Sequence, residues 1–410
     1  MTDECPRLRY LEALPHTQDG KTFVVLRDPL QITEATLIIS PALYQILPLF
    51  NGANSLLDIQ AVLTRSSGRI VFREELEKLL GRFDEALFLD NDHFKQHYEQ
   101  VLRDFQSQNT RPCSHAGQSY PADPVKLTEA IDSFYLHEKG AGLPDSTKGA
   151  QTRAIVAPHI DFRLGGPTYT HAYRALAESG SYDLFVILGT GHLGLSKLFS
   201  ISRKDFETPL GVAPVDREFV DTLDRHLKTE IFAEELTHRS EHTIEFQVVF
   251  LQHLFRNSGL RILPVLVSFS HLDIRRAGER AKLIEHFVEA MRAACMESGK
   301  RICFVASVDL AHIGPRYGDP FHPNDQTVRE VSQKDLQMLE FVKSGDTRGF
   351  VDFVAREEDE RRICGFSPLL TLLRLLAGCR GELLSHSYCW MDSMGSFVTY
   401  ASMVFKDSSG

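Results

Sequence analysis

Three strand-like apolar segments of this chain each lead into a side chain that can bind a metal or transfer a proton. These pairs of segment and terminal residue are 154–158 with His159, 184–189 with His192, and 302–308 with Asp309. Short, fully apolar runs are typical of strands in a sheet that helices cover on both faces. The carboxyl ends of such strands form the ligand-binding edge of open α/β sheets. The pattern therefore predicts an α/β fold with a composite site at that edge, and the residue types favour a metal site.

Two further side chains are candidates for the same site. His312 follows Asp309 by three positions, and a carboxylate beside an imidazole can orient the ring or hold a proton. Cys364 lies just before a helix expected to begin near Ser367. The positive potential of a helix N-terminus favours a thiolate there, whereas the common alternative is an inert, buried thiol.

The segment from His238 to Glu245 allows two interpretations. In the first, His242 lies at a helix start and shares a helix face with Glu245, while Glu241 and Glu245 cap the helix N-terminus. In the second, His238 and His242 form the H-x-x-E-H pattern of inverted zincins and bind zinc for a metallohydrolase reaction. An N-cap at Ser240 would place His238 outside the helix and spoil the spacing that the second interpretation needs.

Composition narrows the class of protein and its surroundings. The 410 residues suffice for two or three domains, and a net charge of −10 argues against a general nucleic-acid role. The seven cysteines are scattered and form no C-x-x-C pair, which fits a reducing cytoplasm. No secretory signal is visible, and no apolar run approaches the ~18 residues of a membrane span. We therefore expect a cytoplasmic protein.

The chain is expected to divide near a polar segment that ends in Pro112. We predict a small α+β domain over residues 1–105, a linker over 106–114, and an α/β domain over 115–410. In the first domain we expect strands at 23–28 and 86–89 and helices at 41–50, 56–59 and 75–83. Its 11 basic and 16 acidic residues oppose binding to duplex nucleic acid. In the second we expect helices at 167–180, 244–257 and 367–378 and strands at 261–267 and 397–405.

Motifs along the second domain resemble those of the Memo family, which includes the prokaryotic form called AmmeMemoRadiSam system protein B. The resemblance covers residues 112–405. The segments that carry it are 115–121, 157–159, 189–192, 241–245, 264–267, 307–312 and 363–365. It implies a fold similar to class III extradiol dioxygenases, with a largely parallel or mixed central sheet flanked by helices.

The resemblance also implies a site at His159, His192 and Cys364, with Asp309 and His312 beside it. Two imidazoles and a thiolate suit iron or copper, with zinc as a further option, better than magnesium or calcium. The dioxygenases instead use two histidines and one carboxylate. Asp309, His312 and His242 are then the expected acid–base groups.

These expectations lead to two candidate functions. The first is a non-haem metal-dependent oxidoreductase, dioxygenase-related, acting on an unknown substrate with a radical SAM protein and other members of the same system as partners. The second is a non-catalytic scaffold that binds a peptide or protein in a vestigial cleft. The order of elements in residues 1–105 resembles a winged helix, in particular PqqD-like modules that bind leader peptides, and this resemblance favours a peptide ligand.

Overall fold

The computed structural model describes residues 5–18, 21–145, 151–276 and 278–406, and the chain forms two compact units. Unit 1 comprises residues 1–108 and unit 2 residues 109–410. Each unit has its own hydrophobic core. Among the described residues, no helix is long and apolar enough to cross a membrane.

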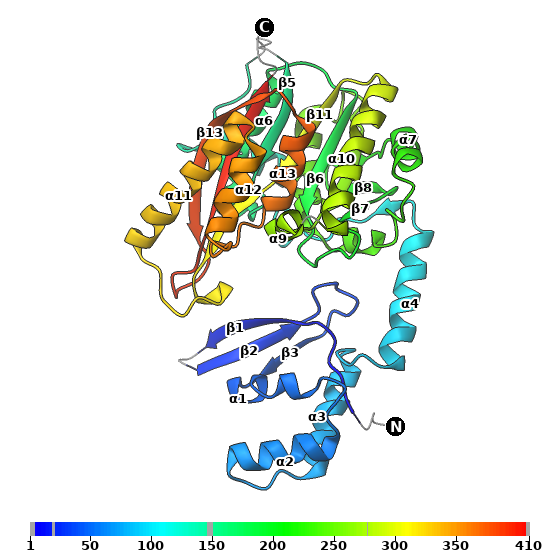
Figure 1. The fold of residues 1–410 in the computed structure, drawn as a ribbon, viewed down its shortest axis with the longest axis vertical. Coiled ribbons are helices and arrows are strands. Elements are labelled where there is room, and N and C mark those ends of the chain that lie inside the picture. Colours follow the sequence, from blue (N-terminus) through cyan, green and yellow to red (C-terminus); the bar gives the residue numbers. More distant parts are fainter. Residues whose placement is uncertain (1–4, 19–20, 146–150, 277, 407–410) are drawn as a thin grey trace. The chain divides into compact units, whose positions relative to one another are not determined.

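Unit 1 is a small α+β domain, as expected. Its antiparallel sheet has the order β1-β2-β3, and helices follow the sheet along the chain (Figure 1). The core contains Leu26, Phe50, Ile59 and Phe83. The elements are β1 (Glu12–Gln18), β2 (Lys21–Arg27), β3 (Thr36–Ile39), α1 (Pro41–Tyr44), η1 (Leu47–Leu49), α2 (Leu56–Ser67), α3 (Arg73–Glu85) and α4 (Asp92–Ser107).

Two expected elements of unit 1 are wrong. The helix expected over 41–50 ends at Tyr44 and continues only as the short η1, because Pro48 has no N–H to donate and disfavours helical geometry in the preceding residue. The strand expected over 86–89 is reduced to an isolated antiparallel bridge between Leu89 and Leu8, because residues 86 and 87 form a turn in which Leu87 has a left-handed φ of 60°. We expected a linker over 106–114; in the structure α4 extends to Ser107, and Thr110–Arg111 form strand β4.

Unit 2 is built on a mixed eight-stranded sheet, which confirms the predicted fold class. The strand order is β12-β14-β5-β11-β6-β10-β7, with β13 paired to β14. The four strands β5, β11, β6 and β10 are parallel, and β14 and β7 run antiparallel to their neighbours. The strands are β5 (Thr152–Ala157), β6 (Leu184–Thr190), β7 (Phe199–Ile201), β10 (Ile262–Val267), β11 (Ile302–Ser307), β12 (Asp309–Ile313), β13 (Arg380–Trp390) and β14 (Phe397–Lys406).

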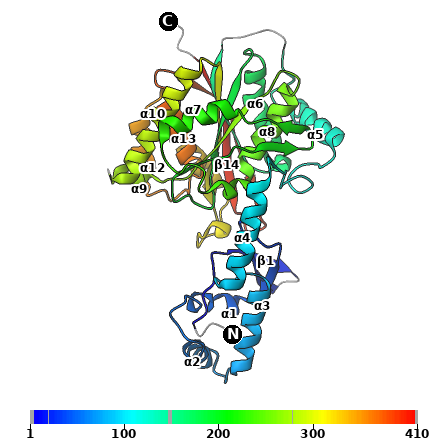
Figure 2. The same ribbon diagram turned by 90° about the vertical axis from the view of Figure 1, so that its right-hand side faces the viewer.

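Helices cover both faces of this sheet. Helices α5, α6 and α8 lie on one side of β14, and α9, α10, α12 and α13 lie on the other (Figure 2). The first group is α5 (Pro124–Leu136), α6 (Phe162–Ala177) and α8 (His242–Phe255). The second is α9 (His271–Arg275), α10 (Glu279–Ser298), α11 (Asp325–Ser344), α12 (Thr347–Arg356) and α13 (Phe366–Leu375), with α7 (Arg217–Leu227) packed on α10. This double cover explains why the central strands are mainly apolar and almost entirely buried.

A small second sheet in unit 2 joins the start of the unit to its middle. Strand β4 pairs in parallel with β8 (Asp205–Thr208), which pairs with β9 (Gly211–Ala213). Helix α6 begins at Phe162, five residues before the Pro167 start that we expected, because Asp161 caps it. The residues that follow β4 contribute to the candidate site described below.

Candidate metal centre

Three histidines converge at the carboxyl-terminal edge of the sheet. His159 follows β5, and His192 follows β6 after the single residue Gly191. His242 is the first residue of α8. That helix begins there because the Glu241 carboxylate accepts hydrogen bonds from the backbone N–H groups of His242 and Thr243, at 2.9 and 3.2 Å.

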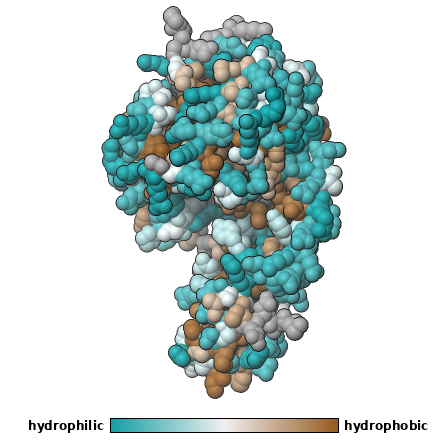
Figure 3. Space-filling view, turned by 45° about the vertical axis from the view of Figure 1, so that its right-hand side comes forward, coloured by the Kyte–Doolittle hydropathy of each residue, from teal (hydrophilic) through white to brown (hydrophobic). Residues whose placement is uncertain are grey.

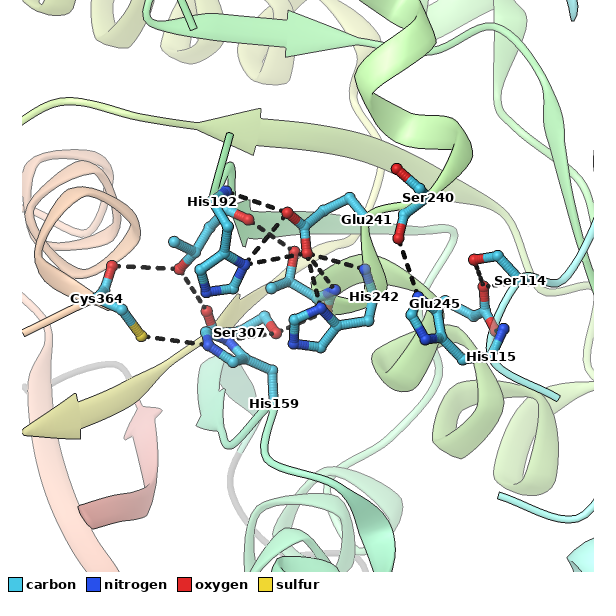
Figure 4. A network of polar contacts seen from close by, with 12 residues as sticks. Ser114, His115, His159, His192, Ser240, Glu241, His242, Glu245, Ser307 and Cys364 are labelled. Carbon is cyan, nitrogen blue, oxygen red and sulfur yellow. Dashed lines mark hydrogen bonds and ion pairs between the residues drawn. The ribbon is translucent and has the colours of Figure 1, made fainter. Parts of the chain in front are cut away.

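The three imidazole rings face one another (Figure 4). One ligand atom from each of His159, His192 and His242 lies within 4.8 Å of the others. Ring centroids are 5.1 to 5.4 Å apart. His159 is buried, whereas the side chains of His192 and His242 are 35% and 31% exposed. An ion or a small molecule can therefore reach the cluster from the side of His192 and His242.

Glu241 holds two of these rings in one orientation. Its carboxylate lies 3.2 Å from Nδ1 of His192 and 3.0 Å from Nδ1 of His242, and it also accepts the backbone N–H of His192. Burial would raise the pKa of Glu241, but the charge of His192 and the hydrogen bonds outweigh it and hold the pKa well below its usual range. An ionised carboxylate that accepts from Nδ1–H makes Nε2 of each ring the nitrogen that carries the lone pair for a ligand.

The hydroxyl group of Ser307 orients the ring of His159, the third histidine of the cluster. Ser307 Oγ donates to the carbonyl of Thr243 at 2.6 Å and accepts from Gln247 at 2.9 Å. The oxygen lies 3.4 Å from Nδ1 of His159, towards which it can act only as an acceptor. Burial first, and then the charges of neighbouring histidines, lower the pKa of His159 well below its usual value. His159 is therefore a neutral imidazole whose Nε2 is available.

The thiol of Cys364 lies beside this cluster. Its Sγ is 3.2 Å from Nε2 of His159 and 3.5 Å from the backbone oxygen of Asp309. Burial, followed by the negative charge of Asp309, raises the pKa of Cys364 well above its usual value. Of the two alternatives for Cys364, these surroundings favour the buried neutral thiol in the metal-free protein, because desolvation and nearby carboxylates oppose the positive potential at the start of α13.

Asp309 supports the backbone around His159. Its Oδ1 accepts the N–H groups of His159 and Ile160 at 2.9 and 3.2 Å, and its Oδ2 lies 3.7 Å from Nε2 of His159. Burial raises the pKa of Asp309 to about 7. His312 bonds the carbonyl of Leu310 through Nδ1, and burial lowers its pKa to about 4.

His238 does not join this cluster. It lies in the 3-10 helix η2 (Glu235–Arg239), is buried, and packs against Phe206. Helix α8 begins only at His242, with Glu241 as its N-cap, so His238 and His242 do not share a helix face. The H-x-x-E-H pattern is thus interrupted by a turn, and the inverted-zincin interpretation is wrong.

Sequence reasoning missed several groups that support the centre. Ser307, two residues before Asp309, belongs to the resemblance segment 307–312 but has no role in the predicted site, although it is a polar residue in an apolar run. Glu245 was interpreted as a capping residue, but it is buried and pairs with Arg111. No local signal identifies this pair, because 134 residues separate its members along the chain.

Fold and site together define an α/β protein with a histidine-rich candidate metal centre at the carboxyl edge of a mixed sheet. The chain belongs to the Memo family: residues 111–404 match the family model described as "Memo-like protein". The matched region corresponds to unit 2 without its first two residues and its last six.

Relatives described as MEMO1 family proteins extend this similarity. One from Aquifex aeolicus is 29% identical over 407 residues, which cover 98% of this chain and 99% of the relative. One from Methanopyrus kandleri is 33% identical over 301 residues, or 71% and 97% of the two chains. One from Sulfolobus acidocaldarius is 32% identical over 304 residues, or 71% and 98%. The first relative is long enough to contain both units, whereas the two archaeal chains have about the length of unit 2 alone.

Proposed function

We propose that this protein binds a redox-active transition metal ion, iron or copper, and acts as an oxidoreductase on a substrate not yet identified. His159 and His192 would bind the ion, and His242 and Cys364 would supply the further donors. The observation that carries this proposal is the shared orientation of the rings: Glu241 and Ser307 occupy Nδ1 of all three histidines and leave Nε2 of each towards the cluster.

The donor set fits such an ion. Bonds of about 2.0–2.3 Å from an ion to nitrogen and sulfur ligands place two ligands of one ion roughly 3–4 Å apart. Cys364 Sγ and His159 Nε2 are separated by 3.2 Å. Imidazole and thiol donors favour iron, copper or zinc over magnesium and calcium, which prefer oxygen ligands.

The ion would supply one-electron redox chemistry, and the residues of the chain prepare the site for it. Glu241 and Ser307 fix the tautomers of the ligand rings, and Asp309 fixes the backbone that carries His159. A carboxyl group with a pKa of about 7, as at Asp309 Oδ2, can hold or release a proton near neutral pH. His312 would remain neutral at the same pH.

Elemental analysis of protein purified without an affinity tag tests this proposal. We expect iron or copper in the wild type and its loss in His159→Ala. His171→Ala is the matched control, since His171, on α6, bonds the carbonyl of Lys139 and has no contact with the cluster among the described residues. Equal metal content in all three proteins would contradict the proposal.

A second candidate function concerns unit 1, where we infer that a peptide or protein partner adds to the edge of the small sheet. Among the described residues, β3 pairs only with β2, so its outer edge is open. Apolar side chains are exposed on this unit (Figure 3). They include Ile38, Leu57, Ile70 and Phe72, with exposed fractions of 58, 73, 66 and 59%. We propose on the same footing that unit 1 is a PqqD-like module and that a radical SAM protein is a partner of this chain.

Selection from a displayed peptide library tests the second candidate. Peptides enriched on the full-length wild type should bind Ile38→Lys less well, because a charge on the open strand discourages edge pairing. Arg225→Ala, in unit 2, provides a control surface change. Micromolar, salt-dependent binding of duplex DNA by the full chain would instead favour a regulatory role.

A further inference from the structure

A buried ion pair links the first residues of unit 2 to the helix that carries His242. The side chains of Arg111 and Glu245 are both 0% exposed and pair through Nη1 of Arg111. The remaining donors of Arg111 bond the carbonyl of His238 at 2.8 Å, the carbonyl of Glu241 at 2.9 Å, and Ser114 Oγ at 2.9 Å. One planar guanidinium group therefore spans two backbone carbonyls, a carboxylate and a hydroxyl.

Glu245 is held equally closely from the other side. Its carboxylate accepts the backbone N–H groups of Ser114 and His115 at 3.0 Å each, and the hydroxyl of Tyr120. His115 in turn donates from Nε2 to the carbonyl of Ser240 at 3.0 Å, since a carbonyl can only accept. Residues 111–115 thus fix three carbonyls in the turn 238–241 that precedes α8.

The same turn carries the residues that orient the histidine cluster. Glu241 is its last residue, and His242 follows as the first residue of α8. A shift of the Glu241 backbone would move its carboxylate away from Nδ1 of His192 and His242 together. The ring of His115 also packs edge-on against His242, with centroids 5.6 Å apart.

We propose that Arg111 and Glu245 are positioning residues of the metal centre, which set the turn that aims Glu241 and His242 at the bound ion. The proposal rests on the proposed metal binding, but it also makes a claim about the metal-free protein. Neither residue is an expected ligand of the ion. Arg111 acts through its hydrogen bonds to the carbonyls of His238 and Glu241, and Glu245 acts by holding Arg111 and the backbone of Ser114 and His115.

A buried ion pair can also be merely structural, and such pairs are weak evidence for stability. What distinguishes this pair is its targets: the guanidinium and His115 bond carbonyls of the turn that presents two groups of the centre. The chain offers a matched control in Arg9 and Asp28, a pair in unit 1 whose side chains are 8% and 0% exposed and lie 2.8 Å apart.

The variants Arg111→Lys, Glu245→Gln and Asp28→Asn of the full chain test the proposal. Lysine keeps the charge at position 111 but cannot span the four acceptors of the guanidinium, and glutamine keeps the shape of Glu245. Three quantities are measured: Co²⁺ affinity and its visible absorption bands, the ring ¹⁵N shifts of His192 and His242 without metal, and the thermal midpoint with chelator present.

We expect Arg111→Lys and Glu245→Gln to weaken Co²⁺ binding about 10–100-fold, the range for outer-shell groups, and to change the absorption bands. In the metal-free variants the Nδ1–H tautomer of the two histidines should no longer dominate. Asp28→Asn should lower the thermal midpoint, but it should keep the wild-type Co²⁺ affinity, absorption bands and histidine tautomers.

Wild-type bands, affinity and tautomers in folded Arg111→Lys and Glu245→Gln would overturn the proposal and leave the pair a structural role. If one of the two variants fails to fold, the other decides. If the wild type binds no Co²⁺, the proposed metal function fails, and the tautomers of the metal-free variants still decide the positioning role.

Discussion

The Sγ atom of Cys364 lies 3.2 Å from Nε2 of His159, close enough for both atoms to bind one ion. The residues come from opposite ends of unit 2, since His159 follows β5 and Cys364 precedes α13. The same sulfur lies 3.5 Å from the backbone oxygen of Asp309, which stabilises the thiol while no metal is present. This contact makes the role of Cys364 testable separately from that of the three histidines.

Replacing Cys364 with Ser should change the absorption spectrum of the metal-loaded protein but should not abolish metal binding. If Sγ binds the ion, Cu²⁺- or Co²⁺-loaded wild type should show a thiolate-to-metal charge-transfer band that Cys364→Ser lacks. His242→Ala should keep this band and bind more weakly, since one imidazole is lost. Absorption spectra of the three proteins decide the matter; a band that survives in Cys364→Ser would exclude Cys364 as a ligand.

Replacing Glu241 with Gln should weaken metal binding about 10–100-fold without removing any expected ligand. Oε1 of Glu241 lies near Nδ1 of both His192 and His242, and Oε2 accepts the backbone N–H of His192, so an amide must turn its NH2 group towards one of these sets of N–H donors. Glu234→Gln is the control, because among the described residues the Glu234 carboxylate accepts the backbone N–H groups of Ser196 and Lys197, outside the histidine cluster. Competition titration with a chelating dye measures both affinities, and equal values would show that Glu241 has no orienting role.

Cys364 should be alkylated slowly in the metal-free protein at neutral pH. Burial and the charge of Asp309 raise the pKa of its thiol, and the thiolate is the reactive form. Exposed Cys5 should be modified first. Peptide mapping after brief treatment with iodoacetamide measures the order. A Cys364 that reacts faster than Cys5 would mean that the helix potential outweighs desolvation after all.

The Arg111–Glu245 pair should make the free energy of unfolding depend on pH in the acidic range. Burial would raise the pKa of Glu245, but the charge of Arg111 and the other donors lower it to about 2. A carboxyl pKa depressed on folding stabilises the protein above the unfolded value near 4.5, and this contribution is lost as the pH falls towards 2.

The corresponding variant, Glu245→Gln, should lower the free energy of unfolding at pH 7 by about 3–5 kcal/mol, as for breaking a buried ion pair. The difference from wild type should shrink as the pH falls from 5 to 3. Urea denaturation of both proteins across this range measures it. A difference independent of pH would assign the loss to packing and not to charge.

The sheet and the position of the site could be predicted because both depend on local patterns. Apolar runs that end in His159, His192 and Asp309 require only that buried parallel strands share one edge. Helix α4 was missed although Phe94, Tyr98, Val101 and Phe105 have helical spacing, because only Phe105 of this mainly polar segment is buried. The placement of His242 next to His192 depends on the turn before α8, whose geometry comes from partners more than a hundred residues away.

The protonation of Cys364 could not be predicted for a related reason. Proximity to a helix start can be read from the sequence, but the carboxylates and the loss of water that oppose ionisation come from distant segments. Ser307 shows the same limit: its hydroxyl matters only because β11 places it beside His159.

Arg111 comes only four residues after Ser107, the last residue of α4. A truncated protein that starts at residue 115, where the sequence suggested that the domain begins, would keep every candidate ligand yet lack Arg111 and Ser114. Boundaries for expression, crystallisation or domain exchange should therefore be drawn at or before Asn109. A fusion joined immediately before Arg111 would place foreign chain directly against the support of the metal centre.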